Sequence, residues 1–115
     1  MSATKRRVIL SSAAEDDFTD ILERTARRFG TVQARIYRDT LKAAIRAIGE
    51  NPTVAGSKGR EELGPGLRTL HVARGGRRGR HVILYRERDD AVVDVLRILF
   101  DTMDFIRHAP MNEEN

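Results

Sequence analysis

Residues 12–51 read SAAEDDFTDILERTARRFGTVQARIYRDTLKAAIRAIGEN and contain two apolar stripes at helical spacing on either side of a single glycine. Ser12 and Glu15 have the spacing of a capping box, in which a serine oxygen and a glutamate satisfy free backbone N–H groups at the start of a helix. Gly30 ends the first stripe, and Thr31 is placed to cap a second helix that closes at the Asn-Pro pair behind it. Because so short a connection holds two helices antiparallel, this stretch predicts a helical hairpin that buries its stripes against another layer.

Shorter segments with the composition of β-strands lie on both sides of this hairpin. Val8–Leu10 precedes it, and β-branched or aromatic runs follow it at residues 67–72, 81–86 and 92–100. The last run is apolar on both alternating faces except at Asp94 and Arg97, as in an interior strand. The predicted class is α+β in the order βααβββ, with an antiparallel sheet that carries the hairpin on one face and leaves the other face partly open. A short helix is expected at residues 102–108.

One domain is expected over residues 1–115, with 109–115 as a flexible tail. An apolar share of 40% is sufficient for one core. The absence of cysteine excludes disulfides and thiolate metal ligands, and no apolar run has the length of a secretory signal or membrane span, so the expected location is the cytoplasm. Lysine and arginine number 21 against 17 acidic residues, which favours an acidic partner without distinguishing nucleic acid from protein.

Arginine supplies the candidate binding groups. Arg68, Arg86 and Arg97 lie on three different expected strands and would form one cationic patch if they converge. The competing interpretation is that each forms a structural ion pair with a carboxylate such as Asp94 or Asp104. Arg97 is the strongest candidate, because a cation inside an apolar strand requires a partner.

A second basic group lies in the glycine-rich segment 73–80, ARGGRRGR. Such a loop can bind phosphates, but it has no interleaved aromatic residues for base stacking, so a solvated loop is the competing interpretation. His71 and His81 flank it on neighbouring strands. Without cysteine or a nearby fixed carboxylate, two histidines do not predict a metal site, and neither a metal nor another cofactor is expected.

Short motifs that follow one another in a set order cover nearly the whole chain. They are residues 8–18, Phe29-Gly30-Thr31 followed by Ala34, Tyr37 and Asn51-Pro52, Gly66-Leu67-Arg68, Val82–Arg86, and Val95–Leu99 followed by Met103-Asp104. In this order and at these separations they resemble the ParE branch of the ParE/RelE toxin superfamily, the plasmid stabilisation family, whose elements have the same βααβββ order. Phe100 and Thr102 depart from it, since these toxins often carry histidine and arginine there.

The resemblance implies the toxin of a type II toxin–antitoxin system. ParE-like toxins are understood to poison DNA gyrase without catalysing a reaction, and a ParD-type antitoxin neutralises them. We therefore expect no catalytic residue, a hetero-oligomer with the antitoxin, no membrane contact, and contact with DNA only through that complex. The expected gyrase-binding residues are Arg68, Arg86, Arg97, Met103, Asp104 and Arg107. The expected antitoxin-binding residues are Ile36, Tyr37, Leu41, Arg68 and Arg86.

Two alternatives stay open. RelE-like members cut messenger RNA at the ribosome with basic side chains plus a C-terminal arginine and tyrosine. Tyr85 is the last tyrosine here, and only Arg107 and His108 remain near the C-terminus, so that set is incomplete. The first alternative is such a ribosome-dependent endoribonuclease, in which Arg68, Arg86 and His108 would bind the phosphate and transfer protons. The second is an inactive relative that only binds an antitoxin and tunes transcription.

Overall fold

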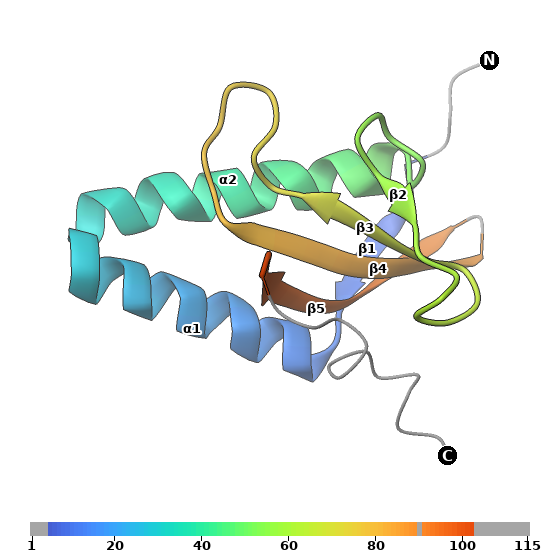
Figure 1. Cartoon of the computed structure of the whole chain (residues 1–115), viewed down its shortest axis with the longest axis horizontal. Helices are drawn as coiled ribbons and strands as arrows, with labels where there is room; N and C mark the ends of the chain where they lie inside the picture. Colours follow the sequence, from blue (N-terminus) through green and yellow to red (C-terminus); the bar gives the residue numbers. More distant parts are fainter. Residues whose placement is uncertain (1–4, 90, 103–115) are drawn as a thin grey trace.

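A helical hairpin and a five-stranded sheet form two packed layers in the computed structural model, which describes residues 5–89 and 91–102 (Figure 1). The elements in chain order are β1 (Arg7–Leu10), α1 (Ser12–Phe29), α2 (Thr31–Glu50), β2 (Lys58–Gly59), β3 (Leu67–His71), β4 (His81–Asp89) and β5 (Val92–Phe100). The strands lie in the order β1-β5-β4-β3-β2, so the first strand pairs with the last. The predicted α+β class and the helical hairpin are confirmed. No helix in the described part of the chain is long and apolar enough to cross a membrane.

The sheet is mixed, and the prediction of an antiparallel sheet was wrong at one edge. β2, β3, β4 and β5 pair antiparallel, whereas β1 runs parallel to β5. Parallel neighbours require a long crossover connection, and the helical hairpin together with β2–β4 separates β1 from β5 in the chain. The two-residue strand β2 was not predicted. The helix expected at 102–108 lies almost entirely outside the described residues, and the tail expected at 109–115 lies wholly outside them.

The cap of α1 is Ser11, one residue before the predicted Ser12. The Ser11 hydroxyl oxygen accepts the Ala14 backbone N–H at 3.0 Å, and the same hydroxyl donates to the Leu96 carbonyl at 2.8 Å. Its backbone N–H also donates to the Val95 carbonyl at 2.9 Å, which continues the pairing of β1 with β5. The start of the helix is therefore fixed by the sheet as well as by the local capping pattern.

A single residue, Gly30, joins the two helices. Its φ of 95° lies in the left-handed region, which glycine adopts without a steric penalty. Its N–H donates to the Ala26 carbonyl and ends α1, and its carbonyl accepts the Ala34 N–H and begins α2. The prediction that Thr31 caps α2 was wrong, because Gly30 completes the reversal and Thr31 is already the first helical residue.

The main core lies between the hairpin and the inner face of the sheet. Its buried members are Ala14, Ile21, Leu41, Ala44, Ile48, Leu70, Val72, Ile83, Tyr85, Val93, Val95 and Ile98. Tyr85 is fully buried, and its hydroxyl donates to the Pro52 carbonyl, so burial leaves the phenol with an acceptor. The N-terminal end of α2 and the arginine-rich loop between β3 and β4 extend beyond the strands (Figure 1).

The opposite face of the sheet is partly covered by the connection between α2 and β3. Leu63 from this connection packs with Leu67 and Leu84 in a second buried cluster, against which Leu96 also packs. Since successive strand residues point to opposite faces, Leu84 faces away from its core neighbour Tyr85. The connection therefore shields part of the face that was predicted to be partly open.

Asp17 attaches α1 to the part of β5 that extends beyond β1. Its carboxylate accepts the Arg97 guanidinium at 2.8 and 3.0 Å, and it also accepts the backbone N–H of Ile98 at 2.8 Å. The side chains of Asp17 and Arg97 are 15% and 25% exposed. One carboxylate thus closes an open strand edge and neutralises a half-buried cation, and both functions require its negative charge.

We expect Asp17→Ala to lower the free energy of unfolding by about 2–3 kcal/mol, because the Ile98 N–H and the Arg97 guanidinium lose this acceptor in a half-buried setting. Urea denaturation followed by circular dichroism measures the change. The neighbouring exposed Asp16→Ala is the control and is expected to cost about 0.5 kcal/mol or less. Equal losses in the two variants would show that Asp17 does not have this role.

Candidate functional site

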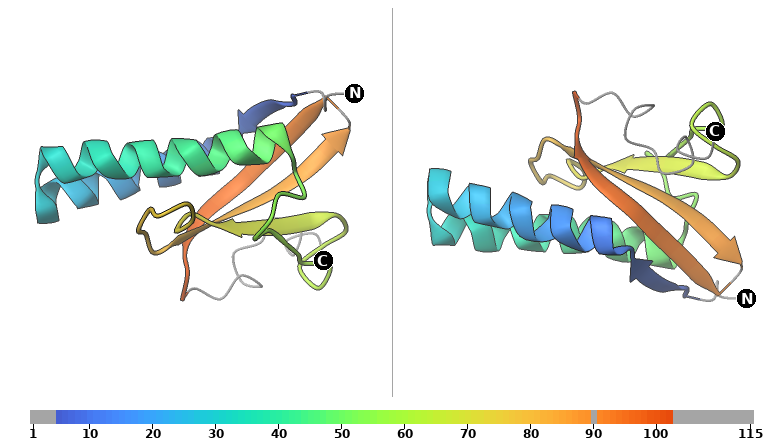
Figure 2. Two further views of the ribbon diagram at one scale, coloured as in Figure 1. Left: turned by 90° about the horizontal axis from the view of Figure 1, so that it is seen from above. Right: turned by 90° about the horizontal axis from the view of Figure 1, so that it is seen from below.

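A cleft of about 1110 Å³ lies between the half of the helical hairpin that contains Gly30 and the end of the sheet where β4 begins and β5 ends. Figure 2 shows the hairpin on one side of the sheet, with the end where α1 meets α2 extending past the strands. The lining residues are Asp17, Asp20, Ile21, Arg24, Thr25, Arg28 and Phe29 of α1, Gln33, Ile36, Tyr37 and Thr40 of α2, Gly76–His81, and Arg97–Phe100 of β5. A site of this size accommodates part of a polypeptide partner.

Large apolar side chains are exposed along this cleft. Phe29 is 65% exposed, Ile36 is 51% exposed and Phe100 is 41% exposed. The guanidinium of Arg28 lies 5.6 Å from the centre of the Phe29 ring, and that of Arg80 lies 5.2 Å from the centre of the Phe100 ring. Such a concentration of exposed apolar surface bordered by charges is typical of a protein-binding face.

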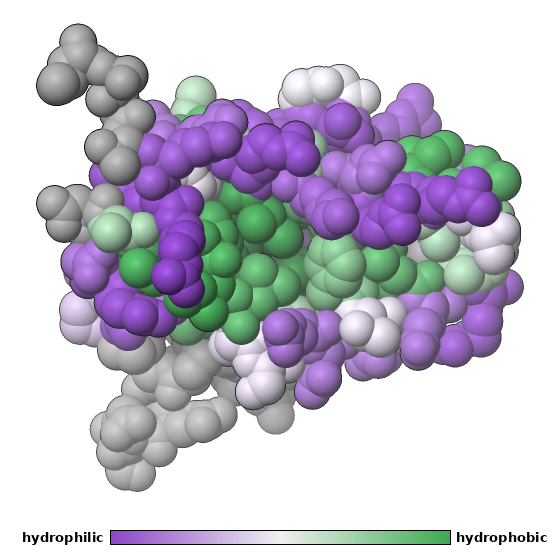
Figure 3. Space-filling model, turned by 180° about the vertical axis from the view of Figure 1, so that it is seen from behind, coloured by the Kyte–Doolittle hydropathy of each residue, from purple (hydrophilic) through white to green (hydrophobic). Residues whose placement is uncertain are grey.

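The outer face of the hairpin carries a second, shallower groove. Figure 3 shows hydrophobic surface running between rows of hydrophilic residues on this side. Val8, Leu10, Phe18 and Ile45 contribute apolar side chains to the groove. Its charged lining residues are Glu15, Asp16, Lys42 and Arg46, so the two signs balance here.

Tyr37 and His81 join α2 to β4 at the base of the cleft. The Tyr37 hydroxyl accepts the Arg80 backbone N–H at 3.1 Å and lies 2.6 Å from His81 Nδ1, so its own proton is available to donate to that nitrogen. Burial lowers the pKa of His81 to about 4, against an opposing attraction from Asp101. Burial also raises the pKa of Tyr37. Both groups are therefore neutral near pH 7, with His81 acting as an acceptor at Nδ1.

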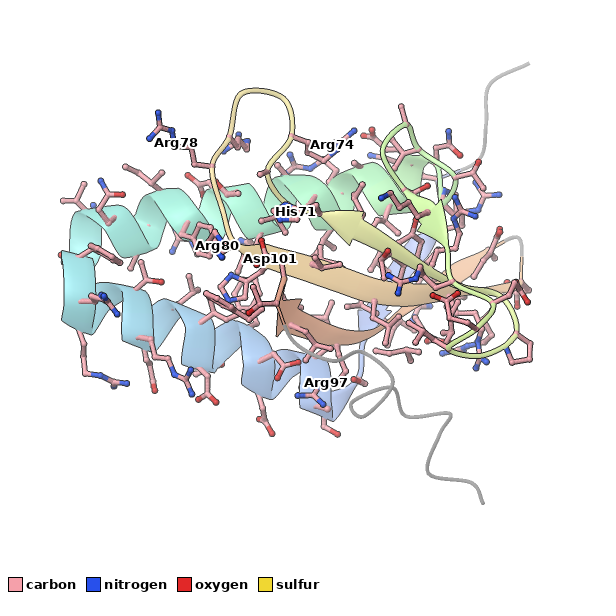
Figure 4. The ribbon with its side chains drawn as sticks, in the orientation of Figure 1. His71, Arg74, Arg78, Arg80, Arg97 and Asp101 are labelled. Atoms are coloured by element: carbon pink, nitrogen blue, oxygen red, sulfur yellow. The ribbon has the colours of Figure 1, made fainter. Side chains whose placement is uncertain are left out.

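His71, Asp101 and Arg80 form a second group beside the first (Figure 4). His71 Nδ1 accepts the Ala73 backbone N–H at 3.0 Å, which leaves Nε2 to donate to the Asp101 carboxylate at 3.0 Å. Arg80 donates to the same carboxylate at 3.3 and 3.4 Å. The hydrogen bond from His71, followed by that from Arg80, lowers the pKa of Asp101. The two groups together tie the end of β5 to the loop before β4.

The basic rim of the cleft comes from two directions. Arg24 and Arg28 project from α1, and Arg77, Arg78 and Arg80 belong to the basic arm, which we define as residues 73–80. Asp20 is an acidic lining residue, and Asp17 is occupied by Arg97. A partner that places apolar side chains on Phe29, Ile36 and Phe100 and carboxylates on these arginines would match the cleft.

The structure distributes the predicted site residues over several places. Ile36 and Tyr37 line the cleft, and Leu41 is fully buried beneath it, so Leu41 contributes packing and no accessible surface. Arg97 lines the cleft while bound to Asp17. Arg68 lies opposite Tyr85 in the sheet register.

The three predicted strand arginines do not converge. Arg86 directly follows Tyr85, and alternation therefore places it on the face opposite to Arg68. Arg68 donates to the Ser57 hydroxyl at 2.7 Å, near β2. Arg97 lies on β5, on the other side of β4 from β3. The expected contacts Met103, Asp104 and Arg107, and the alternative proton carrier His108, lie outside the described residues.

Sequence inspection missed the carboxylates that organise this region. Neither Asp17 nor Asp101 was singled out, although Asp101 follows directly after the last expected strand. Phe100 was noted only as a departure from related toxins. His71 and His81 were considered as metal ligands, but the register pairs His71 with Val82, so the two rings belong to opposite faces of the sheet.

The model of the ParE toxin family of the parDE type II toxin–antitoxin system matches residues 8–105. The chain belongs to the ParE toxin family. It is 32% identical over 102 residues to Toxin ParE1 of Mycobacterium tuberculosis, in both strain CDC 1551 / Oshkosh and strain H37Rv. These matches cover 89% of this chain and 96% of the relatives. The resemblance drawn from the sequence motifs is therefore confirmed.

A solved structure supports the fold of this ParE family member. The chromosomal ParDE toxin–antitoxin system from P. aeruginosa contains a chain that superposes with a TM-score of 0.67 at 18% identity. The match covers 84% of this chain and 96% of that chain. At this identity the likeness concerns the arrangement of helices and strands.

The pKa of His81 gives this ParE protein a defined pH dependence of stability. The folded-state value of about 4 lies below the ordinary value of 6.5, so between these pH values the unfolded chain binds a proton that the folded chain does not. We expect the free energy of unfolding to fall as the pH drops through this window. His81→Gln, which keeps an acceptor for Tyr37, should reduce the fall, while His71→Gln should retain it. Urea denaturation at a series of pH values measures the slopes, and an unchanged slope in His81→Gln would exclude His81 as the cause.

Proposed function

We propose that this protein is a toxin that inhibits DNA gyrase without catalysing a reaction, acts in the cytoplasm, and is neutralised by a ParD-type antitoxin. The observation that carries the proposal is membership of the ParE toxin family over residues 8–105. ParE-type toxins are understood to act on gyrase, which is why gyrase is the proposed target.

The cleft is the proposed antitoxin-binding face. It combines exposed Phe29, Ile36 and Phe100 with a rim of arginines, and this combination fits a segment that alternates apolar and acidic side chains. A segment with so many charges cannot bury a core of its own, so it would fold on binding to the toxin. Ile36 and Tyr37 retain their proposed role in this contact.

The proposed absence of catalysis is supported by how the ionisable groups of the cleft and of the sheet are placed. His81 is neutral near pH 7 and hydrogen-bonded to Tyr37, and Tyr85 is fully buried. Arg68 and Arg86, which the nuclease alternative uses together, face opposite sides of the sheet. General acid–base cleavage requires a proton carrier and a cation at one phosphate.

The second candidate function is ribosome-dependent cleavage of messenger RNA. One observation favours it: His71 has a side chain that is 39% exposed, and Arg80 shares its carboxylate partner Asp101. An imidazole and a guanidinium therefore lie close together at the surface, which is the pairing that phosphodiester cleavage uses. An inactive relative that only binds its antitoxin would show neither activity.

Parallel activity assays separate these functions. The purified full-length chain is added to gyrase with supercoiled and relaxed plasmid, and in parallel to ribosomes translating a messenger RNA. We expect inhibition of supercoiling with trapped cleaved DNA, and intact RNA. Cut RNA with unaffected gyrase would replace the proposal with the nuclease. If the ParD-type antitoxin abolished neither activity, the proposed neutralisation would be contradicted.

A pair of matched variants tests the proposed antitoxin-binding face. Ile36→Asp places a charge on an exposed apolar residue of the cleft, and we expect the affinity for the antitoxin to fall by about 30-fold or more, since such anchor positions are worth about 2 kcal/mol or more. Val32→Asp alters another exposed apolar residue of α2, 63% exposed, that does not line the cleft, and it should change the affinity little. Isothermal titration calorimetry measures both. Greater weakening by Val32→Asp would place the antitoxin elsewhere.

A further inference from the structure

The basic arm projects from the sheet between β3 and β4 (Figures 1 and 4). Residues 73–80 read ARGGRRGR and contain four arginines and no acid. In Figure 4 the side chain of Arg78 points away from the body of the molecule, whereas Arg74 extends toward the connection after α2, where it meets the Ala55 carbonyl, and Arg80 points back toward Asp101. The arm therefore has a tip that is open to solvent and a base that is attached.

The tip is narrow because two successive glycines make its turn. Gly75 and Gly76 have φ values of 59° and 81°, and the Arg77 N–H donates to the Arg74 carbonyl at 3.0 Å. Two central residues with positive φ and this hydrogen bond define a tight hairpin turn. Both glycines have open space where a side chain would lie. The tip consequently presents backbone and guanidinium groups, with no apolar side chain.

The base of the arm is held by the polar groups of the cleft. The Tyr37 hydroxyl accepts the Arg80 backbone N–H at 3.1 Å. Gly79 packs so closely here that a Cβ atom would lie 2.8 Å from the Tyr37 hydroxyl and 2.6 Å from the Val72 side chain, which leaves no room for a larger residue. Arg80 is bound to Asp101 at 3.3 Å. A fixed base with an open tip is suited to placing charges on a rigid partner, because less chain entropy is lost on binding.

The tip arginines have no carboxylate within ion-pair distance among the described residues. The ion pairs of the described part of the chain include Arg80 of the arm but not Arg74, Arg77 or Arg78. The Arg74 guanidinium donates to the Ala55 carbonyl, at 3.5 Å. Three neighbouring cations without acidic partners repel one another, and an external polyanion would relieve that repulsion.

We propose that the tip of the basic arm, Arg74, Arg77 and Arg78, binds the phosphate backbone of duplex DNA. Arg77 and Arg78 also border the cleft, where an acidic segment of the antitoxin would reach them, but the tip itself has no apolar or aromatic anchor for a protein partner, whereas phosphate contacts need only cations. Duplex DNA presents regular rows of closely spaced phosphates, which neighbouring guanidinium groups can contact without an apolar or base-specific interaction. This departs from the expectation that DNA is reached only through the antitoxin complex.

The inference extends the proposed function without requiring it. A toxin seated on gyrase would lie beside the DNA that gyrase holds, so a phosphate contact would add to a protein contact made elsewhere. Binding to DNA alone is nevertheless a property of the arm, and it is measured without gyrase or antitoxin. Failure of the DNA measurement would leave the gyrase assay unaffected, and the reverse also holds.

The test is the salt dependence of binding to a fluorescein-labelled duplex of about 20 base pairs, two helical turns, followed by anisotropy from about 50 to 200 mM KCl. Each phosphate contact contributes about 0.9 to the slope of log K against log salt. We expect Arg77→Ala/Arg78→Ala to make the slope shallower by about 1.8. The control Arg35→Ala/Arg38→Ala removes the same charge from exposed α2 positions that do not line the cleft, and it should leave the slope as in the wild type.

Three outcomes would overturn the proposal. The first is no binding of the wild-type chain at the lowest salt concentration. The second is an equal change of slope in both double variants, which would show that only net charge matters. The third is an unchanged slope in Arg77→Ala/Arg78→Ala, which would show that the tip does not contact the phosphates of the duplex. Far-ultraviolet circular dichroism of each variant checks that the fold is retained.

Discussion

The position of α1 against β5 depends on one carboxylate. Asp17 accepts two hydrogen bonds from Arg97 and one from the Ile98 backbone, at the point where β5 has passed the end of β1 and has an open edge. Ser11 adds a second attachment through the Leu96 carbonyl. These bonds fix where the first helix begins and how it leaves the sheet. Because Gly30 then reverses the chain within one residue, α2 must return alongside α1, and the far half of the hairpin extends beyond the strands (Figure 2).

The cleft is a consequence of this geometry, and polar groups at its base keep it in shape. Tyr37 and His81 are both neutral near pH 7, so the base of the cleft contains a hydrogen bond between uncharged groups instead of a buried charge. The charges lie at the rim, where water and a partner reach them. Apolar surface near Phe100 and the basic arm therefore meet at one edge. The two proposed contacts, with a protein and with DNA, share Arg77 and Arg78, whereas the exposed apolar side chains serve the protein contact alone.

The sequence predicted what local chemistry determines. The helical hairpin, the strands and the role of Gly30 follow from periodicity and glycine conformation, and the family motifs add the order of the elements. Features set by long-range pairing were missed: the parallel β1–β5 contact and the Asp17–Arg97 bond join residues about 80 positions apart. Arg68 and Arg86 were expected to converge, but the register between β3 and β4 decides which face each occupies, and a shift of one residue reverses the answer. The aromatic contact of Phe100 with His81 has the same origin, since only the register places them opposite each other.

Hydrogen–deuterium exchange of the full chain, alone and bound to its antitoxin, tests most directly whether the cleft is the surface on which this toxin is neutralised. The two faces of the hairpin are separate enough for the exchange pattern to distinguish them, since the cleft is bordered by residues 76–81 and 97–100 and the outer groove by Val8, Leu10 and Ile45. If the account is correct, the antitoxin slows exchange in residues 76–81 and at the end of β5 and leaves β1 unchanged. Slower exchange in β1 and the adjoining turns of the helices, with the residues around the cleft unaffected, would contradict it.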